Sequence, residues 1–503
     1  FALSAVLISA TAISASAATT DNALNIRYTY TSGDYTFEKV SHVNSPLETN
    51  DGVVDYLGDG KVGTYIPGVS EEGNGDRGQS YSYAAASYGD WVYIGTMYGG
   101  LGVSSILSHG MNGIDADTAK AAMDVMYNGN LYLGEPDSKY AGGILYKFNV
   151  KTGETKILMA RSENGKIPTF RGAVQKDGKL YFVGMILDLV NNPGLTQQEI
   201  STAIAMQNGF PCVYEIDPAN DDALTCIYDC GVKDVTDYRQ LVHDSVFTST
   251  RAISFYEDTL VVGGLNTDGV FLAASDHPSD GQDSFKSILT MDDFRTLGVI
   301  PAYHRSDVNG GGGIYQALEY NGKLYVVVCT GDLASQSDET GTKSSFGILC
   351  GKLRDGGDPT EHDDWSWSVL AGPDGTNAKY PLGLDKERVS AGACTLQVYD
   401  DYLYIGDYND VSSALQNMVL KKNFHTLYTN LQQSINLYRM DADENVEKIV
   451  GDPTEAFPES MTGVGSGFGT HMTQYTWQTT VHEGKMYLST MDETTLLEPI
   501  AQF

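Results

Sequence analysis

The strongest constraint on the fold is a hairpin sequence that the chain repeats. In its clearest copy, the alternating segment Ile314–Tyr320 is followed by Asn321-Gly322 and then by the almost entirely apolar segment Lys323–Cys329. Asn-Gly is typical of a two-residue type I′ turn, because both central positions need a positive φ. An almost unbroken apolar strand has to be covered on both faces. The pattern therefore predicts a β-hairpin that lies between two other layers.

Five further segments follow the same pattern and turn at short pairs that contain Gly, Asp or Glu. They run over 81–96, 171–184, 251–264, 393–407 and 475–490. Repetition of one supersecondary unit at long spacing indicates a repeat architecture. We therefore expect six equivalent hairpins, each of them the inner part of a repeating unit.

Most copies are followed by a second, less apolar hairpin. The expected strand pairs are 144–150 with 154–160, 212–217 with 223–229, 270–275 with 284–289, 346–353 with 365–370, and 435–441 with 445–450. An inner and an outer hairpin make a four-stranded blade, and blades repeated around an axis leave only short, protected sheet edges. The expected fold class is therefore an all-β propeller with six inner hairpins and six or seven blades.

Over nearly its whole length the chain resembles the β-propeller superfamily. The resemblance is to the architecture, because the motifs of particular subfamilies are missing from the sequence. These are the WD dipeptide pattern, the Ser-x-Asp-x-Gly-x-x-Trp box of sialidase propellers and the tryptophan-docking repeat of quinoprotein dehydrogenases. The resemblance implies a ring of blades around an axis and no particular reaction.

The chain is strongly acidic, with 32 Lys and Arg against 65 Asp and Glu and a formal net charge of −33. Nucleic acids and anionic membranes are bound largely through neutralisation of phosphates by Lys and Arg. The charge therefore argues against both as partners, and no segment after the N-terminal one reaches the ~20 apolar residues of a membrane span. Evenly spaced strand signals leave no interdomain linker, so we expect one domain over 18–503.

The N-terminal segment predicts export. Phe1–Ala17 is apolar and ends in Ala15-Ser16-Ala17, which matches the hydrophobic region and cleavage site of a secretory signal. An initial Met and a basic region are missing, so we expect this signal to be incomplete. The last inner hairpin has no outer partner before Phe503, which indicates truncation there as well. A hairpin predicted within 25–43 can complete that blade; the alternative is a seventh blade beyond Phe503.

Six cysteines suit an oxidising compartment; they are Cys212, Cys226, Cys230, Cys329, Cys350 and Cys394. Cys212 and Cys226 lie nearly opposite in a predicted hairpin, so their bridge is the favoured disulfide. Free buried thiols are the alternative. The chain has no Cys-x-x-Cys pair or HExxH motif, and its acidic loops lack the Gly and distal Glu of an EF-hand. No metal site is therefore expected, and the sequence implies no particular cofactor.

One face of the predicted ring carries the insertions. In a propeller, the loops that enter the innermost strands open on the same face as the loops that join the two hairpins of a blade. Three of these joining loops contain predicted helical insertions, over 116–127, 196–208 and 411–433. Insertions gathered on one face usually mark the binding face. Alternatively, they only cover the ends of the apolar strands.

The entry loops hold an unusual share of the cationic residues. The chain has only eleven arginines, and five lie in or beside these loops: Arg77, Arg171, Arg251, Arg305 and Arg388. Equivalent positions in a ring converge on its axis, and a guanidinium fork binds carboxylate, sulfate or phosphate in a bidentate manner. The alternative is that each arginine satisfies nearby carbonyls or acids such as Asp76 and Asp307.

The sequence thus predicts a secreted propeller that recognises an anionic small molecule or glycan in a central pocket lined by Arg and His. Gln79, Tyr81, Tyr475 and Trp477 begin inner strands and are further candidates for ligand contact. Transferase, hydrolase or lyase activity needs a general acid or base, for which His304 and His471 in the entry loops are the candidates. The alternative is a non-catalytic extracellular module that binds protein or polysaccharide.

Overall fold

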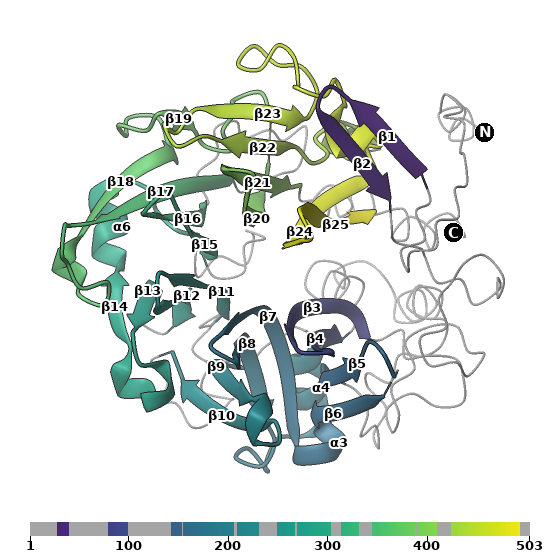
Figure 1. The fold of residues 1–503 in the computed structure, drawn as a ribbon, viewed down its shortest axis with the longest axis vertical. Helices are drawn as coiled ribbons and strands as arrows, with labels where there is room; N and C mark the ends of the chain where they lie inside the picture. The colour runs from purple at the N-terminus through teal and green to yellow at the C-terminus, as the bar shows by residue number, and fades with distance from the viewer. Residues whose placement is uncertain are drawn as a thin grey trace.

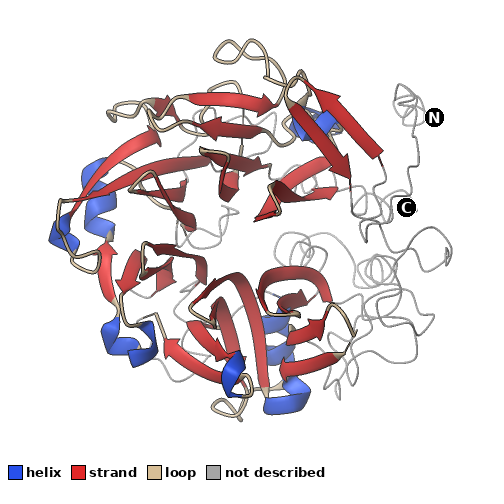
Figure 2. Cartoon of the chain, viewed as in Figure 1, coloured by secondary structure: helices blue, strands red, loops and turns tan. Residues whose placement is uncertain are grey.

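The computed structural model describes residues 28–39, 79–98, 142–152, 154–205, 209–230, 249–266, 269–302, 313–330, 345–388, 390–409 and 424–492. The chain is a β-propeller, in which antiparallel sheets are arranged around a central axis (Figure 1). Strands form nearly all of the ring, and the short helices lie outside the innermost strands (Figure 2). Within the described residues, no helix is both long and apolar enough to cross a membrane.

The described residues include five four-stranded blades, each of which runs outwards from its first strand. The first two blades contain β3 (Gln79–Tyr88), β4 (Trp91–Tyr98), β5 (Leu145–Asn149), β6 (Thr155–Met159), β7 (Lys166–Lys176), β8 (Lys179–Asp188), β9 (Phe210–Asp217) and β10 (Ala223–Tyr228). The next two contain β11 (Ser249–Tyr256), β12 (Thr259–Asn266), β13 (Gly269–Ser275), β14 (Lys286–Leu289), β15 (Ile314–Tyr320), β16 (Lys323–Thr330), β17 (Ser345–Leu353) and β18 (Trp365–Gly372). The fifth contains β20 (Gly392–Tyr399), β21 (Tyr402–Tyr408), β22 (Leu437–Met440) and β23 (Val446–Val450).

A sixth inner hairpin, β24 (Thr473–His482) with β25 (Lys485–Asp492), follows the fifth blade. β1 (Tyr28–Ser32) and β2 (Tyr35–Lys39) form a separate two-stranded sheet, and β19 (Tyr380–Pro381) pairs in parallel with β18. All six predicted inner hairpins are confirmed. Six or seven complete blades are not, because β25 pairs only with β24 among the described strands.

Four α-helices are described, and two of them lie in predicted insertions. They are α3 (Arg161–Asn164), α4 (Gln197–Ala205), α6 (Met291–Leu297) and α8 (Phe424–Leu431). Short 3₁₀ turns are η3 (Pro218–Asn220), η4 (Pro278–Asp280), η5 (Gln282–Ser284), η6 (His362–Asp364) and η7 (Ser466–Gly469). The helix expected over 116–127 lies outside the described residues. α6 was not expected from the sequence; Thr290 and Asp293 form a capping box at its start.

The β15–β16 hairpin shows why the repeated sequence folds into a blade. Asn321 and Gly322 have φ values of 51° and 70°, as a type I′ turn requires. Every residue of β16 after its first lysine is buried. On one face of the strand, Val326 packs in the same core as β12 of the third blade. On the other face, Val327 packs with β20 of the fifth blade. The unbroken apolar sequence therefore fills two interfaces between blades.

Polar groups connect the outer parts of neighbouring blades. Asp222, at the turn of the second blade, accepts hydrogen bonds from Tyr93 at 2.6 Å and from Lys147 at 2.9 Å, both in the first blade. Glu444, at the turn of the fifth blade, pairs with Lys323 of the fourth at 2.6 Å. Such partly buried pairs fix the relative position of two sheets more specifically than apolar contact does. The blades are therefore joined by apolar cores inside and by ion pairs outside.

The predicted Cys212–Cys226 disulfide is wrong, because all six cysteines are free thiols. The strand register explains the difference. Cys226 of β10 lies opposite Tyr214, two residues along β9 from Cys212, and the register shifts again after Cys226. Diagonal neighbours in a sheet are about 7–8 Å apart at Cα, which is too far for an unstrained disulfide.

Candidate functional site

Six inner strands surround the centre of the ring, and each has a register shift in its first half (Figure 1). The residues at one shift of each strand are Tyr83 in β3, Arg171 in β7, Arg251 in β11, Tyr315 in β15, Cys394 in β20 and Trp477 in β24, where Gln478 stands at the same shift. β3 and β24 have a second shift nearer their start. A β-bulge leaves one residue unpaired and re-aims its side chain. We call these six residues the axial cluster.

The sequence places the bulges at the same point in every repeat. Each member of the axial cluster lies six positions before the first residue of its hairpin turn, as Arg171 does before Asp177. At the bulge of β7 the next strand has Gly184, where an added Cβ would lie 2.2 Å from the carbonyl oxygen of Thr169. Only glycine allows this close approach of the two strands. The local sequence therefore determines that Arg171 is the residue of β7 that stays unpaired with β8.

Arg251 contacts three other members of the cluster. Its guanidinium carbon lies 4.1 Å from the ring centroid of Tyr315 and 4.6 Å from that of Trp477. Its Nη2 donates a long hydrogen bond, 3.5 Å, to Sγ of Cys394. Arg251 is only 7% exposed. Its neighbours therefore supply aromatic faces and a thiol, which attract a cation without adding negative charge.

Arg171 and Tyr83 extend the cluster to the first blade. The guanidinium carbon of Arg171 is 5.8 Å from the ring centroid of Tyr83. The Tyr83 ring in turn stacks on Trp477, with centroids 5.0 Å apart and an interplanar angle of 15°. Because β3 belongs to the first blade and β24 to the last inner hairpin, this stack joins the two ends of the ring at its axis.

The described side chains that contact Arg251 carry no charge near neutral pH. Burial is the largest cause that lowers the pKa of Arg171, and the positive charge of Arg251 acts in the same direction. Burial also lowers the pKa of Arg251, but Cys394, Tyr83, Tyr315 and Tyr408 together outweigh it and raise that pKa. Burial raises the pKa of Cys394 itself to about 11, against the effect of Arg251. At pH 7 this thiol is protonated, so it leaves the charge of Arg251 in place.

Two other predicted residues lie in a polar network of the fifth blade. Arg388 is buried; its Nη1 lies 3.4 Å from Oδ2 of Asp452, and its Nη2 donates to the carbonyl of Ser434 at 2.9 Å. The hydroxyl of Ser434 lies 3.4 Å from Nδ1 of His471. Arg388 therefore has an acidic partner and a carbonyl close to it, unlike Arg251.

Tyr475 lies beside the axial cluster. Of the remaining predicted residues, some lie within the described part of the chain and others lie outside it. The Tyr475 ring stacks on Tyr408 at 5.0 Å and lies 5.8 Å from Trp477. Gln79 and Tyr81 lie in β3. Three candidates lie outside the described residues: Arg77, His304 and Arg305.

Sequence reasoning missed Tyr83, Tyr315 and Cys394 as members of the axial cluster. The prediction rested on the positive charge of residues in the entry loops, and Arg388 shares that charge. The signal that finds all six positions is the constant spacing to the hairpin turn. The described residues include no group of three or more His, Cys, Asp or Glu side chains that could hold a metal ion.

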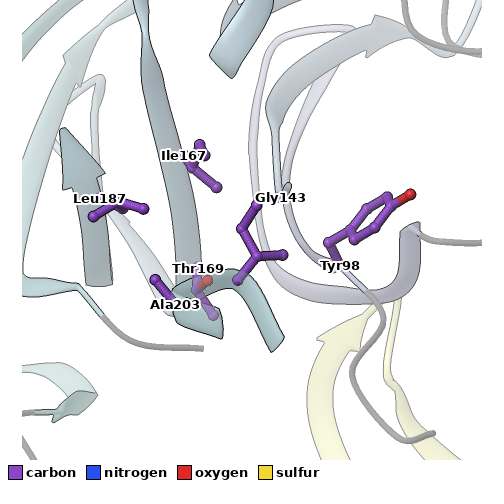
Figure 3. Close-up of a pocket in the computed structure, with 7 residues that line it drawn as sticks. Tyr98, Gly143, Ile167, Thr169, Leu187 and Ala203 are labelled. Atoms are coloured by element: carbon purple, nitrogen blue, oxygen red, sulfur yellow. The ribbon is translucent and has the colours of Figure 1, made fainter. Parts of the chain in front are cut away.

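A small pocket, lined by no member of the axial cluster, lies between the first two blades and α4 (Figure 3). It is lined by Tyr98, Gly143, Ile167, Thr169, Leu187, Ala203 and Ile204. Most of these side chains belong to an apolar cluster that α4 covers. The lining has no charged group, so it offers little to fix a polar ligand. We therefore treat the axial cluster as the candidate site.

No protein-family model matches the chain, and no curated protein is similar to it. Solved structures are similar at low identity. A protein of unknown function from Bacteroides thetaiotaomicron is 13% identical, with a TM-score of 0.34, over 81% of this chain and 66% of its own length. An α-L-arabinofuranosidase from Clostridium thermocellum is 11% identical, with a TM-score of 0.28, over 72% of this chain and 91% of its own.

The β-propeller domain of a protease from Pyrococcus furiosus is 10% identical, with a TM-score of 0.25. The match covers 73% of this chain and 81% of that domain. At these identities and TM-scores, similarity carries no argument about activity. The function is therefore inferred from the side chains of the axial cluster.

Proposed function

We propose that the axial cluster binds the anionic group of a small molecule or glycan. The observation that carries this proposal is Arg251, a nine-tenths buried guanidinium whose described neighbours are aromatic rings and a protonated thiol. A buried charge without a counter-charge costs several kcal/mol, so an anion that reached it would be strongly stabilised. Arg171 in the next blade adds a second guanidinium, whose positive charge favours the same ligand.

Arginine geometry limits the anion to a few chemical groups. A guanidinium presents its donors as a planar fork that matches carboxylate, sulfate or phosphate oxygens. The cluster contains no His, Asp or Glu, the residues that serve most often as general acid or base. We therefore propose binding as the role of this cluster. Transferase, hydrolase or lyase chemistry would need a further group, for which His304 and His471 remain the candidates.

The proposal is tested by replacing Arg251 with glutamine. We expect the affinity for a sulfated or carboxylated ligand to fall about ten- to a hundredfold, because a hydrogen bond to a charged group contributes about 1.5–3 kcal/mol. Calorimetry against a panel of such compounds measures the affinity, with the melting temperature as a control for folding. Arg251→Lys should show an intermediate loss, because it keeps the charge without the fork.

The matched control is Arg295→Gln, which removes an exposed arginine that pairs with Asp292 on α6. This variant should bind as the unaltered protein does. Equal affinity of the Arg251→Gln variant for every anion that the unaltered protein binds would contradict the axial site. A lowered melting temperature with unchanged affinity would show that Arg251 stabilises the centre of the ring and does not bind the ligand.

We also propose that the protein is exported. The support is the apolar segment Phe1–Ala17 with small residues at its end, as in a secretory signal. We expect the mature chain to begin near Ala18. N-terminal sequencing of material from the culture medium measures this directly. Protein that stays inside the cells and keeps residues 1–17 would contradict export.

We further propose that β24–β25 and the N-terminal hairpin β1–β2 belong to one sixth blade. Glu38 of β2 pairs with Lys485 of β25 at 2.8 Å. The Phe37 ring lies edge-on to Phe468, which precedes β24, with centroids 5.8 Å apart. In this arrangement the N-terminal hairpin supports β24, the strand that carries Trp477. Closure of the ring would then hold one wall of the axial cluster in place.

A further inference from the structure

Helix α8 exposes its aromatic residues and buries polar ones. Phe424 and Tyr428 are 62% and 59% exposed, whereas Thr426 and Asn430 are 1% and 0% exposed. Residues at i and i+4 lie on one face of a helix, so the two aromatic rings are neighbours. Large exposed apolar side chains grouped on one face mark an interaction surface more often than scattered ones do.

The buried face of α8 is attached to the strand that leads into the axial cluster. The side-chain amide of Asn409 donates to the Asn430 side chain at 2.8 Å and also to Oε1 of Gln474. The backbone N–H of Asn409 donates to the Gln474 carbonyl at 2.9 Å. Gln474 directly precedes Tyr475 in β24. Hydrogen bonds therefore hold α8 in a fixed orientation, with Phe424 and Tyr428 on its outer side.

The charge and the size of this surface limit which kind of ligand can bind to it. The helix contains no Asp, Glu, Lys or Arg, although the whole chain has a net charge of −33. A helix without these residues on an acidic protein favours a neutral partner, and a second copy of the chain would be repelled. A stable protein interface needs about 800 Å² from each partner, far more than two side chains provide. Membrane-surface helices depend on Lys and Arg on their polar face, which α8 lacks.

A sugar ring fits these limits. Its C–H face is apolar and of the size of one aromatic ring, and its hydroxyl groups remain in water at the edge of the contact. Tyr428 also offers a phenolic hydroxyl for a hydrogen bond. We propose that Phe424 and Tyr428 form a binding site for neutral sugar residues of a polysaccharide. This site is separate from the axial cluster and does not depend on the function proposed for it.

The experiment measures retention of the full chain by neutral polysaccharides: cellulose, xylan, arabinan, mannan and starch, in affinity gels and pull-downs. We expect at least one of them to retain the unaltered protein. Removal of each ring, by Phe424→Ala and Tyr428→Ala, should weaken retention about tenfold. The variants Phe424→Tyr and Tyr428→Phe keep the rings and should retain most of the binding.

Two controls make the result specific. Tyr88→Ala removes a tyrosine that is 37% exposed at the end of β3, next to the hairpin turn, and should leave retention unchanged. Arg251→Gln should also leave it unchanged, which separates this site from the axial one. The proposal is overturned if no neutral polysaccharide retains the protein or if the double alanine variant binds equally well. It is also overturned if that variant instead loses self-association or binding to lipid vesicles.

Discussion

Replacing Lys448 with methionine is expected to lower the free energy of unfolding by about 3–5 kcal/mol. The Lys448 side chain is 0% exposed, and its ammonium lies 3.0 Å from a carboxylate oxygen of Asp385, itself 1% exposed. It also donates to Thr454 and to the carbonyl of Asp452. Burial lowers the pKa of Lys448 while Asp385 opposes this effect. The pair itself therefore adds little net stability, but loss of the lysine leaves a buried carboxylate without its cation.

Chemical unfolding monitored by fluorescence measures the effect at pH 7. The double variant Lys448→Met with Asp385→Leu should recover most of the loss, because no uncompensated charge remains. The control Lys485→Met breaks an exposed pair with Glu38 and should leave the stability nearly unchanged, because water screens such a pair. If the single and double variants are equally unstable, the loss comes from packing and the ion-pair explanation fails.

Removal of residues 1–39, which include the β1–β2 hairpin, is expected to destabilise the protein by about 2–5 kcal/mol. The hairpin contributes three partly buried aromatic side chains, Tyr30, Tyr35 and Phe37, and a fully buried one contributes about 1.5–3 kcal/mol. Tyr35 accepts a hydrogen bond from Arg439 at 2.8 Å, and Phe37 packs against Phe468. Because the hairpin contacts β25 and the segment before β24, its loss should also make β24 more mobile.

A peptide covering residues 25–43, added to the shortened chain, provides the decisive comparison. We expect it to bind and to restore the melting temperature, because strands that complete a sheet can be supplied separately. A chain that begins at Asn25 is the control and should melt as the full chain does. If removal of the hairpin leaves the melting temperature unchanged, the proposed sixth blade is incorrect.

The blades were predictable because turn and core signals coincide in short segments. In the β15–β16 hairpin, Asn321-Gly322 fixes the turn, and the alternating and unbroken apolar segments fix which strand lies between layers. The outer hairpins were also found, although their ends differ by a few residues from the predicted ones. The seven-residue helix α6 escaped prediction, because so short a helix has little periodicity and depends on its capping box at Thr290.

The axial cluster was predictable only in part. Arg171, Arg251 and Trp477 were expected, since charge and aromatic character are visible in the sequence. Tyr315 and Cys394 look like ordinary core residues by type, and only their constant spacing to the hairpin turn marks them as bulge positions. Arg388 was grouped with the others by charge, yet it stands twelve residues before its turn and lies with Asp452. The disulfide was mispredicted because it required the register of β9 and β10.

The bulges also allow the side chains at the centre of the ring to change without a change in the strand pairing that stabilises the blades. A residue that stands outside the ladder can be exchanged without loss of a backbone hydrogen bond. Because each inner hairpin contributes one such residue, all six positions can vary without a change in strand pairing. Arg251 and Cys394 already show how different two of them have become. Divergence at these points alone would give a descendant of this chain a new ligand while its blades stayed the same.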